Sequence, residues 1–196
     1  MPRKSTKKNL ILEIAKNSFS KHGYNGTSLG DIAAEAGIQK SSLYAHFQSK
    51  DDLFLYVFRY AHECSLSQIK AICADPSFSD EEKLFQIFST TCNNDAVNIF
   101  RMSFYPLPNI QEQISSIFTD NVSQTYQMAS TLFDHLKSSG AMIDRPNNMI
   151  FDLYVTLMNG AMFNIPEPST MLQDSVAYYW NCFCEWSGLR DNPTLI

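Results

Sequence analysis

Apolar residues recur at spacings of three and four along nearly the whole chain, which is the spacing of one face of an α-helix. Between residues 6 and 22, for example, Leu10, Ile11, Ile14 and Phe19 mark one such stripe. The alternation typical of a half-buried β-strand does not stand out, and glycine and proline interrupt the helical pattern. The sequence therefore predicts an all-α protein, with helices at about residues 6–22, 29–35, 49–74, 80–92, 95–105, 109–138, 146–164 and 170–187 and a short one after Gly37.

Two glycine-containing turns organise the first fifty residues. Gly23 is expected to end the first helix, and Thr27 or Ser28 to cap the second, because Ser28 and Asp31 have capping-box spacing with Asp in place of the usual Glu or Gln. Gly37 then permits a sharp turn into the short third helix. A helix, a tight glycine turn and a second short helix predict a helix-turn-helix motif.

The third helix has a composition that suits close approach to a surface. Ser41, Ser42 and Ala45 are small, so they would let the helix enter a major groove, which is about 12 Å wide. Leu43 and Phe47 would face back and fix the helix on the first two helices. The alternative is a small polar helix that merely separates two core helices.

Polar side chains around this helix suit the two kinds of DNA contact. Gln39 and Lys40 can reach base edges, while Tyr44, His46 and Lys50 can reach phosphates together with the serine hydroxyls. Residues 1–60 hold nine Lys and Arg against five acids, a balance of +4. The remaining residues hold six bases and fifteen acids, a balance of −9, although a solvated basic tail would give the same count. This asymmetry favours a polyanion contact at the N-terminal end alone.

Composition argues against several other classes of protein. The start Met-Pro-Arg-Lys lacks a following apolar stretch, so we expect no signal peptide, and no run approaches a membrane span. The five cysteines have no metal-type spacing and suit free thiols in a reducing cytoplasm. Catalytic motifs such as G-x-S-x-G, H-E-x-x-H or a glycine-rich phosphate loop are lacking, so we expect no enzyme, no cofactor and no metal.

One family shares this pattern closely. Residues 10–54 resemble the DNA-binding domain of the TetR family of one-component bacterial transcription regulators. The residues at family spacing are Phe19, Gly23, Tyr24, Thr27, Ile32, Ala33, Ala36, Gly37, Leu43, Tyr44, Phe47, Lys50 and Leu53. The resemblance implies a helix-turn-helix domain at residues 1–50 and a helical ligand-binding and dimerisation domain at residues 51–196.

The resemblance also implies residue roles. Its DNA-contacting positions are Thr27, Ser28, Gln39, Lys40, Ser41, Ser42, Tyr44, His46 and Lys50, with Lys7 and Lys8 as outer phosphate contacts. Position 39 is usually Ser or Thr in the family and position 41 is often Gly or Ala, so Gln39 and Ser41 leave open which bases are contacted. The implied function is a cytoplasmic, ligand-responsive repressor that binds a palindromic operator in double-stranded DNA as a homodimer. A small, mostly apolar inducer would release it.

The C-terminal region offers candidates for ligand and partner contacts. Aromatic and methionine side chains are abundant there and can line an adaptable cavity, although they are equally typical of plain core. The candidate pocket residues are Phe88, Phe104, Tyr105, Tyr126, Tyr154 and Met158. The candidate dimer residues are Met158, Ala161, Tyr179, Phe183 and Trp186, which could instead cover the protomer's own core.

Two alternative functions keep the DNA-binding domain but replace the small-molecule inducer. A redox sensor would use Cys64, Cys73 or Cys92 as its switch. A DNA-tethered adaptor would have no inducer and would contact another protein.

Overall fold

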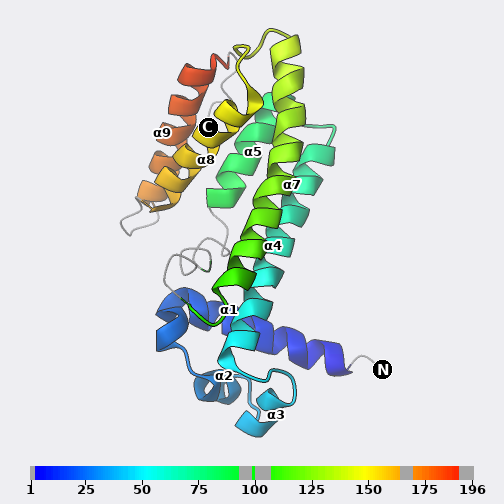
Figure 1. Ribbon diagram of the computed structural model, residues 1–196, viewed down its shortest axis with the longest axis vertical. Coiled ribbons are helices and arrows are strands. Elements are labelled where there is room, and N and C mark those ends of the chain that lie inside the picture. The colour runs from blue at the N-terminus through cyan, green and yellow to red at the C-terminus, as the bar shows by residue number, and fades with distance from the viewer. Residues whose placement is uncertain (1–2, 93–98, 100–106, 164–169, 190–196) are drawn as a thin grey trace. The chain divides into compact units, whose positions relative to one another are not determined.

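A computed structural model describes residues 3–92, 99, 107–163 and 170–189 (Figure 1). Over these residues the chain forms eight helices and no strand, which confirms the predicted all-α class. The helices are α1 (Arg3–Gly26), α2 (Leu29–Glu35), α3 (Lys40–Tyr44), α4 (Lys50–Ala74), α5 (Asp80–Cys92), α7 (Gln111–Ser138), α8 (Asn147–Phe163) and α9 (Thr170–Ser187). The helix predicted at 95–105 lies, apart from residue 99, outside the described residues. None of the described helices is both long and apolar enough to span a lipid bilayer.

The chain divides into two compact units. The first unit comprises Met1–Cys64 and Asp95–Asp120, and the second comprises Ser65–Asn94 and Asn121–Ile196. Helices α4 and α7 therefore contribute residues to both units. The division at residue 50 drawn from the sequence remains a prediction.

The first unit is organised around an aromatic core under α1, α2 and α3. The ring of Phe54 on α4 meets the rings of Phe19 and Tyr24 edge to face, at 5.0 and 5.4 Å between centroids. Ile32 of α2 and Leu43 of α3 are fully buried in the same cluster. Burial of these side chains is the main force that holds α2 and α3 against α1 and α4, because helices of five to seven residues are unstable alone.

Gly23 breaks the first helix as the sequence predicts. Its φ of 72° lies in the left-handed region, and the helical turn that follows it ends at Gly26. An L-residue with a side chain would be strained in that conformation. The break lets the chain turn towards α2 within a few residues.

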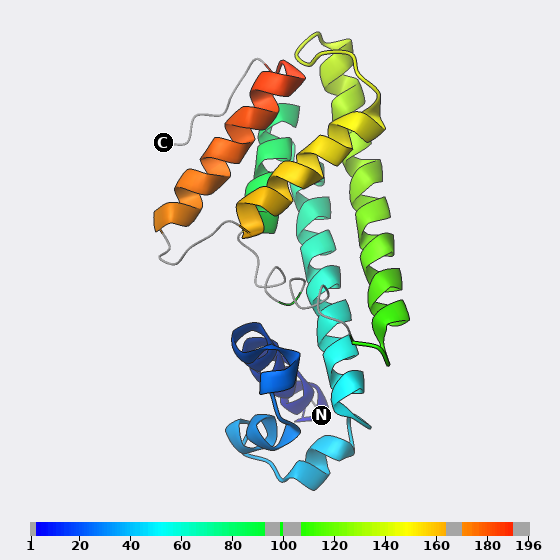
Figure 2. The ribbon, with the colours of Figure 1, turned by 60° about the vertical axis from the view of Figure 1, so that its left-hand side comes forward.

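The second unit is built from α5, α8, α9 and the C-terminal parts of α4 and α7. Helices α8 and α9 lie side by side, and α5 packs on both (Figure 2). Tyr154 is completely buried at the centre, 5.5 Å from Phe88 and 5.1 Å from Phe183 between ring centroids. Trp180 joins the same cluster at 5.5 Å from Phe183. The aromatic surplus of the sequence therefore supplies the core of this unit.

Candidate nucleic-acid interface

The turn between α2 and α3 has a defined geometry. Gly37 has a φ of 65°, and its N–H donates to the carbonyl of Ala34 at 3.1 Å. The N–H of Ile38 donates to the carbonyl of Ala33 at 2.9 Å. This pair of bonds is a Schellman motif, and Ile38 packs on the core beside it. The motif fixes the direction in which α3 leaves the turn.

The start of α2 is capped by Ser28 and not by Thr27. The Ser28 Oγ accepts from the N–H of Asp31 at 3.1 Å, as the capping pattern predicts. Thr27 is buried, with 3% of its surface exposed, and its hydroxyl donates to the carbonyl of Gly23 at 2.8 Å. Thr27 therefore stabilises the turn after α1, and its side chain has no surface to offer a phosphate.

Helix α3 has one buried and one exposed face. Leu43 and Phe47 are buried, which agrees with the orientation expected from the sequence. The candidate contact residues around the same helix are all exposed; they are Gln39, Lys40, Ser41, Ser42, Tyr44 and His46. Gln39 occupies the N-cap position with an extended backbone but makes no side-chain capping bond. Its amide oxygen accepts a long bond from the Ser41 hydroxyl at 3.5 Å, so the side chain stays on the exposed face at the helix start.

The start of α4 lies beside the end of α1. Ser49 caps α4 by accepting from the N–H of Asp52 at 3.0 Å, and Asp52 accepts in turn from the N–H of Gln48 at 3.0 Å. The ammonium of Lys50 lies over the ring of Tyr24, 4.3 Å from its centroid. Tyr24 and Lys50 are both among the residues that match the family spacing, but the sequence alone does not indicate that they touch.

A carboxylate holds this pair in place. Asp51 accepts a hydrogen bond from the hydroxyl of Tyr24 through Oδ1, and from the amide of Asn109 at 3.4 Å through Oδ2. Burial, together with the bond to Asp51, raises the pKa of Tyr24 to about 12, so the hydroxyl remains a donor at neutral pH. Burial also lowers the pKa of Lys50, while the charge of Asp51 acts in the opposite direction.

These contacts form a surface that can bind the phosphates of a nucleic acid and contact its base edges. Exposed amide, hydroxyl and ammonium groups on α3 can donate to base edges and phosphates, while the buried face keeps the helix at one depth. Lysines from three segments surround it: Lys8 on α1, Lys40 on α3 and Lys50 on α4. The fold and the site together define a helix-turn-helix DNA-binding protein.

Comparison with known proteins agrees with this class. Residues 11–57 match the family model of bacterial regulatory proteins of the tetR family. The chain is 33% identical over 129 residues to the HTH-type transcriptional regulator RutR of Escherichia coli strain K12, covering 66% of this chain and 47% of RutR. It is 44% identical over 50 residues to the HTH-type transcriptional regulator QacR of Staphylococcus aureus strain Mu50, covering 26% and 27% of the two chains. The N-terminal part of the chain is therefore a helix-turn-helix domain of the TetR family of transcriptional regulators.

Solved structures resemble the chain over nearly its whole length. A protein from Saccharomonospora viridis, described as a transcriptional regulator and solved in complex with choline, superposes with a TM-score of 0.82 at 18% identity. The alignment covers 93% of this chain and 97% of that one. A TetR transcription regulator from Haloarcula marismortui gives a TM-score of 0.75 at 19% identity, with 94% and 97% covered. In sequence, by contrast, the match covers about half the length of RutR and less of QacR.

The candidate pocket residues occupy different environments in the second unit. Phe88, Tyr154 and Met158 are buried among core side chains, and the Tyr154 hydroxyl donates to the carbonyl of Leu84 at 2.7 Å. Tyr126 is half-buried and meets Phe151 edge to face at 5.1 Å. The other two candidates, Phe104 and Tyr105, lie outside the described residues.

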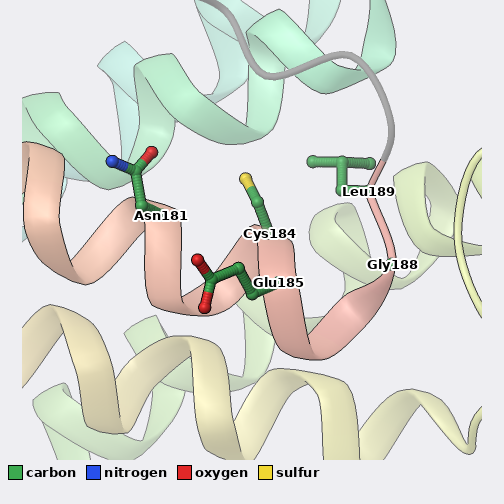
Figure 3. A pocket seen from close by; sticks show the side chains of 5 residues that line it. All are labelled: Asn181, Cys184, Glu185, Gly188 and Leu189. Carbon is green, nitrogen blue, oxygen red and sulfur yellow. The ribbon is translucent and has the colours of Figure 1, made fainter.

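A described cavity opens elsewhere, along α9. It has a volume of about 470 Å³ and is lined by Asn181, Cys184, Glu185, Gly188 and Leu189. Figure 3 shows Asn181, Cys184 and Glu185 on α9, with Gly188 and Leu189 directly after the helix. None of these residues was among the candidates from the sequence, because a single stretch of α9 gives no signal of a concave surface.

The candidate dimer residues also separate into two groups. Phe183, Ala161 and Met158 are buried within the second unit, and Phe183 has no exposed surface left for a partner. Tyr179 and Trp186 are partly exposed, and Trp186 lies under the guanidinium of Arg145 at 4.3 Å. Tyr178, the neighbour of Tyr179 on α9, is 64% exposed.

Proposed function

We propose that this protein is a ligand-responsive transcriptional repressor that binds a palindromic operator as a homodimer in the cytoplasm. The observation that carries this proposal is α3, whose polar face is exposed while Leu43 and Phe47 anchor its other face in the core. Two copies related by a two-fold axis would address half-sites about one helical turn apart, roughly 34–36 Å or slightly more. Ser28, Gln39, Lys40, Ser41, Ser42, Tyr44, His46 and Lys50 remain the proposed contacts.

Selection from a random duplex pool tests the DNA-binding step. The protein should enrich one inverted-repeat sequence, and a gel-shift titration should show binding that weakens with salt. Ser42→Glu would place a carboxylate on the exposed face of α3, so it should abolish binding without unfolding the protein. Ser67→Glu adds the same charge at an exposed position of the second unit and is the matched control. Equal loss in both variants, or no enriched sequence, would refute the proposal.

The proposed inducer is a small apolar, aromatic or cationic molecule bound in the second unit. Its support is the density of aromatic side chains there, together with the choline complex of the structural neighbour from Saccharomonospora viridis. Aromatic faces attract quaternary ammonium groups within about 6 Å. Half-buried Tyr126, beside Phe151, is the described candidate that an entering ligand could reach most directly.

Ligand binding and operator release should be measured in the same screen. Quaternary ammonium and apolar aromatic compounds that raise the melting temperature should also abolish the gel shift. A tenfold to hundredfold loss of operator affinity needs about 1.4–2.7 kcal/mol of differential binding, and DNA must weaken the ligand by the same factor. Compounds that stabilise the protein but leave the operator bound would show a pocket without a switch.

The cysteine-based alternative has less support from the structure. Burial raises the pKa of Cys92 to about 12 and raises the pKa of Cys73, so both thiols are held in the less reactive protonated form. Cys64 is exposed and is the remaining candidate switch. Operator binding that survives mild oxidation in wild-type protein would remove this alternative. The adaptor alternative has no structural observation in its favour.

A further inference from the structure

The side chain of Lys8 rests on a pair of aromatic rings. Its ammonium is 4.0 Å from the centroid of the Tyr56 ring and 5.9 Å from that of Phe47. The two rings meet edge to face at 5.6 Å. The contact therefore joins three segments of the first unit: α1, the residues that follow α3, and α4.

The two rings differ in how firmly they are held. Phe47 is 2% exposed and belongs to the core cluster, whereas Tyr56 is 38% exposed. Tyr56 thus packs against a buried ring while a large part of its own surface remains exposed. Lys8 itself is only partly buried, so its ammonium keeps access to solvent or to an anion.

The same arrangement recurs at two of the proposed DNA contacts. Lys50 lies 4.3 Å from the centroid of Tyr24, and Lys40 lies 6.0 Å from that of Tyr44. A flexible lysine side chain loses rotamer entropy when a partner fixes it. A ring that already restricts the side chain reduces that loss at the moment of binding.

We propose that Tyr56 is a positioning residue, which holds Lys8 in place to contact a phosphate at the edge of the α3 surface. This inference rests on the proposed function, because it assigns a further contact and its support to the same DNA interface. The ring faces one side of the ammonium and leaves N–H donors on the other side for a phosphate oxygen. A cation–π contact at an exposed site contributes about 0.5–1 kcal/mol.

Gel-shift titrations over a range of salt concentrations test the two residues separately. Lys8→Ala should reduce the slope of log affinity against log salt by about 1, because one phosphate contact is lost. Tyr56→Leu should weaken binding about twofold to fivefold, the equivalent of 0.5–1 kcal/mol, and Tyr56→Phe should retain wild-type affinity because it keeps the ring. Lys70→Ala removes a lysine from the second unit and should leave the slope unchanged.

A double variant distinguishes positioning from a general structural effect. If Tyr56 acts through Lys8, Tyr56→Leu should have no further effect on affinity in the Lys8→Ala background. An equal effect in both backgrounds, or an unchanged salt slope in Lys8→Ala, would overturn the proposal. Melting curves and circular dichroism on each variant separate lost contacts from lost folding.

A measurement without DNA provides an independent check. The ring current of Tyr56 should shift the Lys8 side-chain protons upfield in the NMR spectrum of the free protein. Tyr56→Leu should remove this shift and Tyr56→Phe should keep it; unshifted protons in the wild type would overturn the positioning role. Wild-type protein that binds no duplex would instead refute the proposed function itself, and the phosphate contact with it.

Discussion

Lys50 illustrates how a single residue is prepared for its proposed role. The side chain lies over Tyr24, the hydroxyl of Tyr24 is held by Asp51, and burial lowers the lysine pKa while the charge of Asp51 acts in the opposite direction. The nearby carboxylate and the ring face offset part of the cost of burying the ammonium. Such a lysine is ordered before DNA arrives.

Lys50→Ala should therefore weaken binding to every duplex sequence and reduce the salt slope by about 1. Gel-shift titrations at several salt concentrations measure both quantities. Arg59→Ala, at an exposed position further along α4 in the same unit, is the matched control. Unchanged salt dependence in Lys50→Ala would show that the interface is docked differently.

Gln39→Ala should change base preference while leaving stability nearly unchanged. The Gln39 side chain makes no capping bond, so its loss removes little from the folded state. Gln39→Ser should instead add a cap and raise the free energy of unfolding by about 1 kcal/mol or less. Repeating the duplex selection would show relaxed preference at one base pair, and an altered preference at several positions would argue against a single contact.

At the scale of elements, the turn between α2 and α3 requires a residue that can adopt a positive φ at position 37. Gly37→Ala should cost about 1–2 kcal/mol of stability, because φ near 65° strains an L-residue. Gly30→Ala is the matched control: its new Cβ would make ordinary contact with Ser28 Oγ at 3.5 Å inside α2, so stability should rise by about 0.5–1 kcal/mol. Thermal or denaturant unfolding measures both, and equal effects would contradict the turn's special geometry.

Because Phe183 is buried in the protomer, we now propose that the dimer forms through the exposed side of α9, at Tyr178. Tyr178→Asp should produce a folded monomer with reduced operator affinity, because a charge would enter an interface that the free protomer leaves open. Phe183→Asp should instead unfold the second unit, since its side chain is fully buried in the protomer. Sedimentation and circular dichroism distinguish the two outcomes, with Ser123→Asp on α7 as the charge control. A persistent Tyr178→Asp dimer would move the interface elsewhere.

At the scale of the whole molecule, alkaline pH should destabilise the fold. Burial is the main reason why the pKa values of Cys92, Cys184 and Tyr24 are each raised to about 12. The neutral forms are favoured in the folded state, so their stabilisation is fully present below the ordinary thiol and phenol range. It should be lost as pH rises from about 9 to 12. Lys50 opposes this trend, because its lowered pKa relieves a burial cost as it deprotonates.

Melting temperatures measured from pH 7 to 11 under reducing conditions test this expectation. Cys92→Ala should show a shallower decline than wild type, because one buried titrating group is gone. Cys64→Ala removes an exposed thiol and should follow the wild-type curve. Identical slopes in wild type and Cys92→Ala would exclude Cys92 as a source of alkaline sensitivity.

The helices and the turns between them could be predicted from the sequence because their signals are local. Apolar spacing, the glycines at positions 23 and 37 and the cap at Ser28 each act within a few residues. The same local pattern predicted that Leu43 and Phe47 face the core while their neighbours on α3 stay exposed. The family resemblance, which the comparisons confirm, added the class of function.

The tertiary structure decided which residues meet across the chain. Only packing of α1 against α4 places Tyr24 under Lys50 and Tyr56 under Lys8. Packing also buried Thr27 and Phe183, whose types and spacings suited a contact surface equally well. A stripe of aromatic residues has the same period whether it faces its own core or a partner, so periodicity cannot distinguish the two. That choice depends on which neighbouring helix covers the stripe, and the covering helix is a property of the fold as a whole.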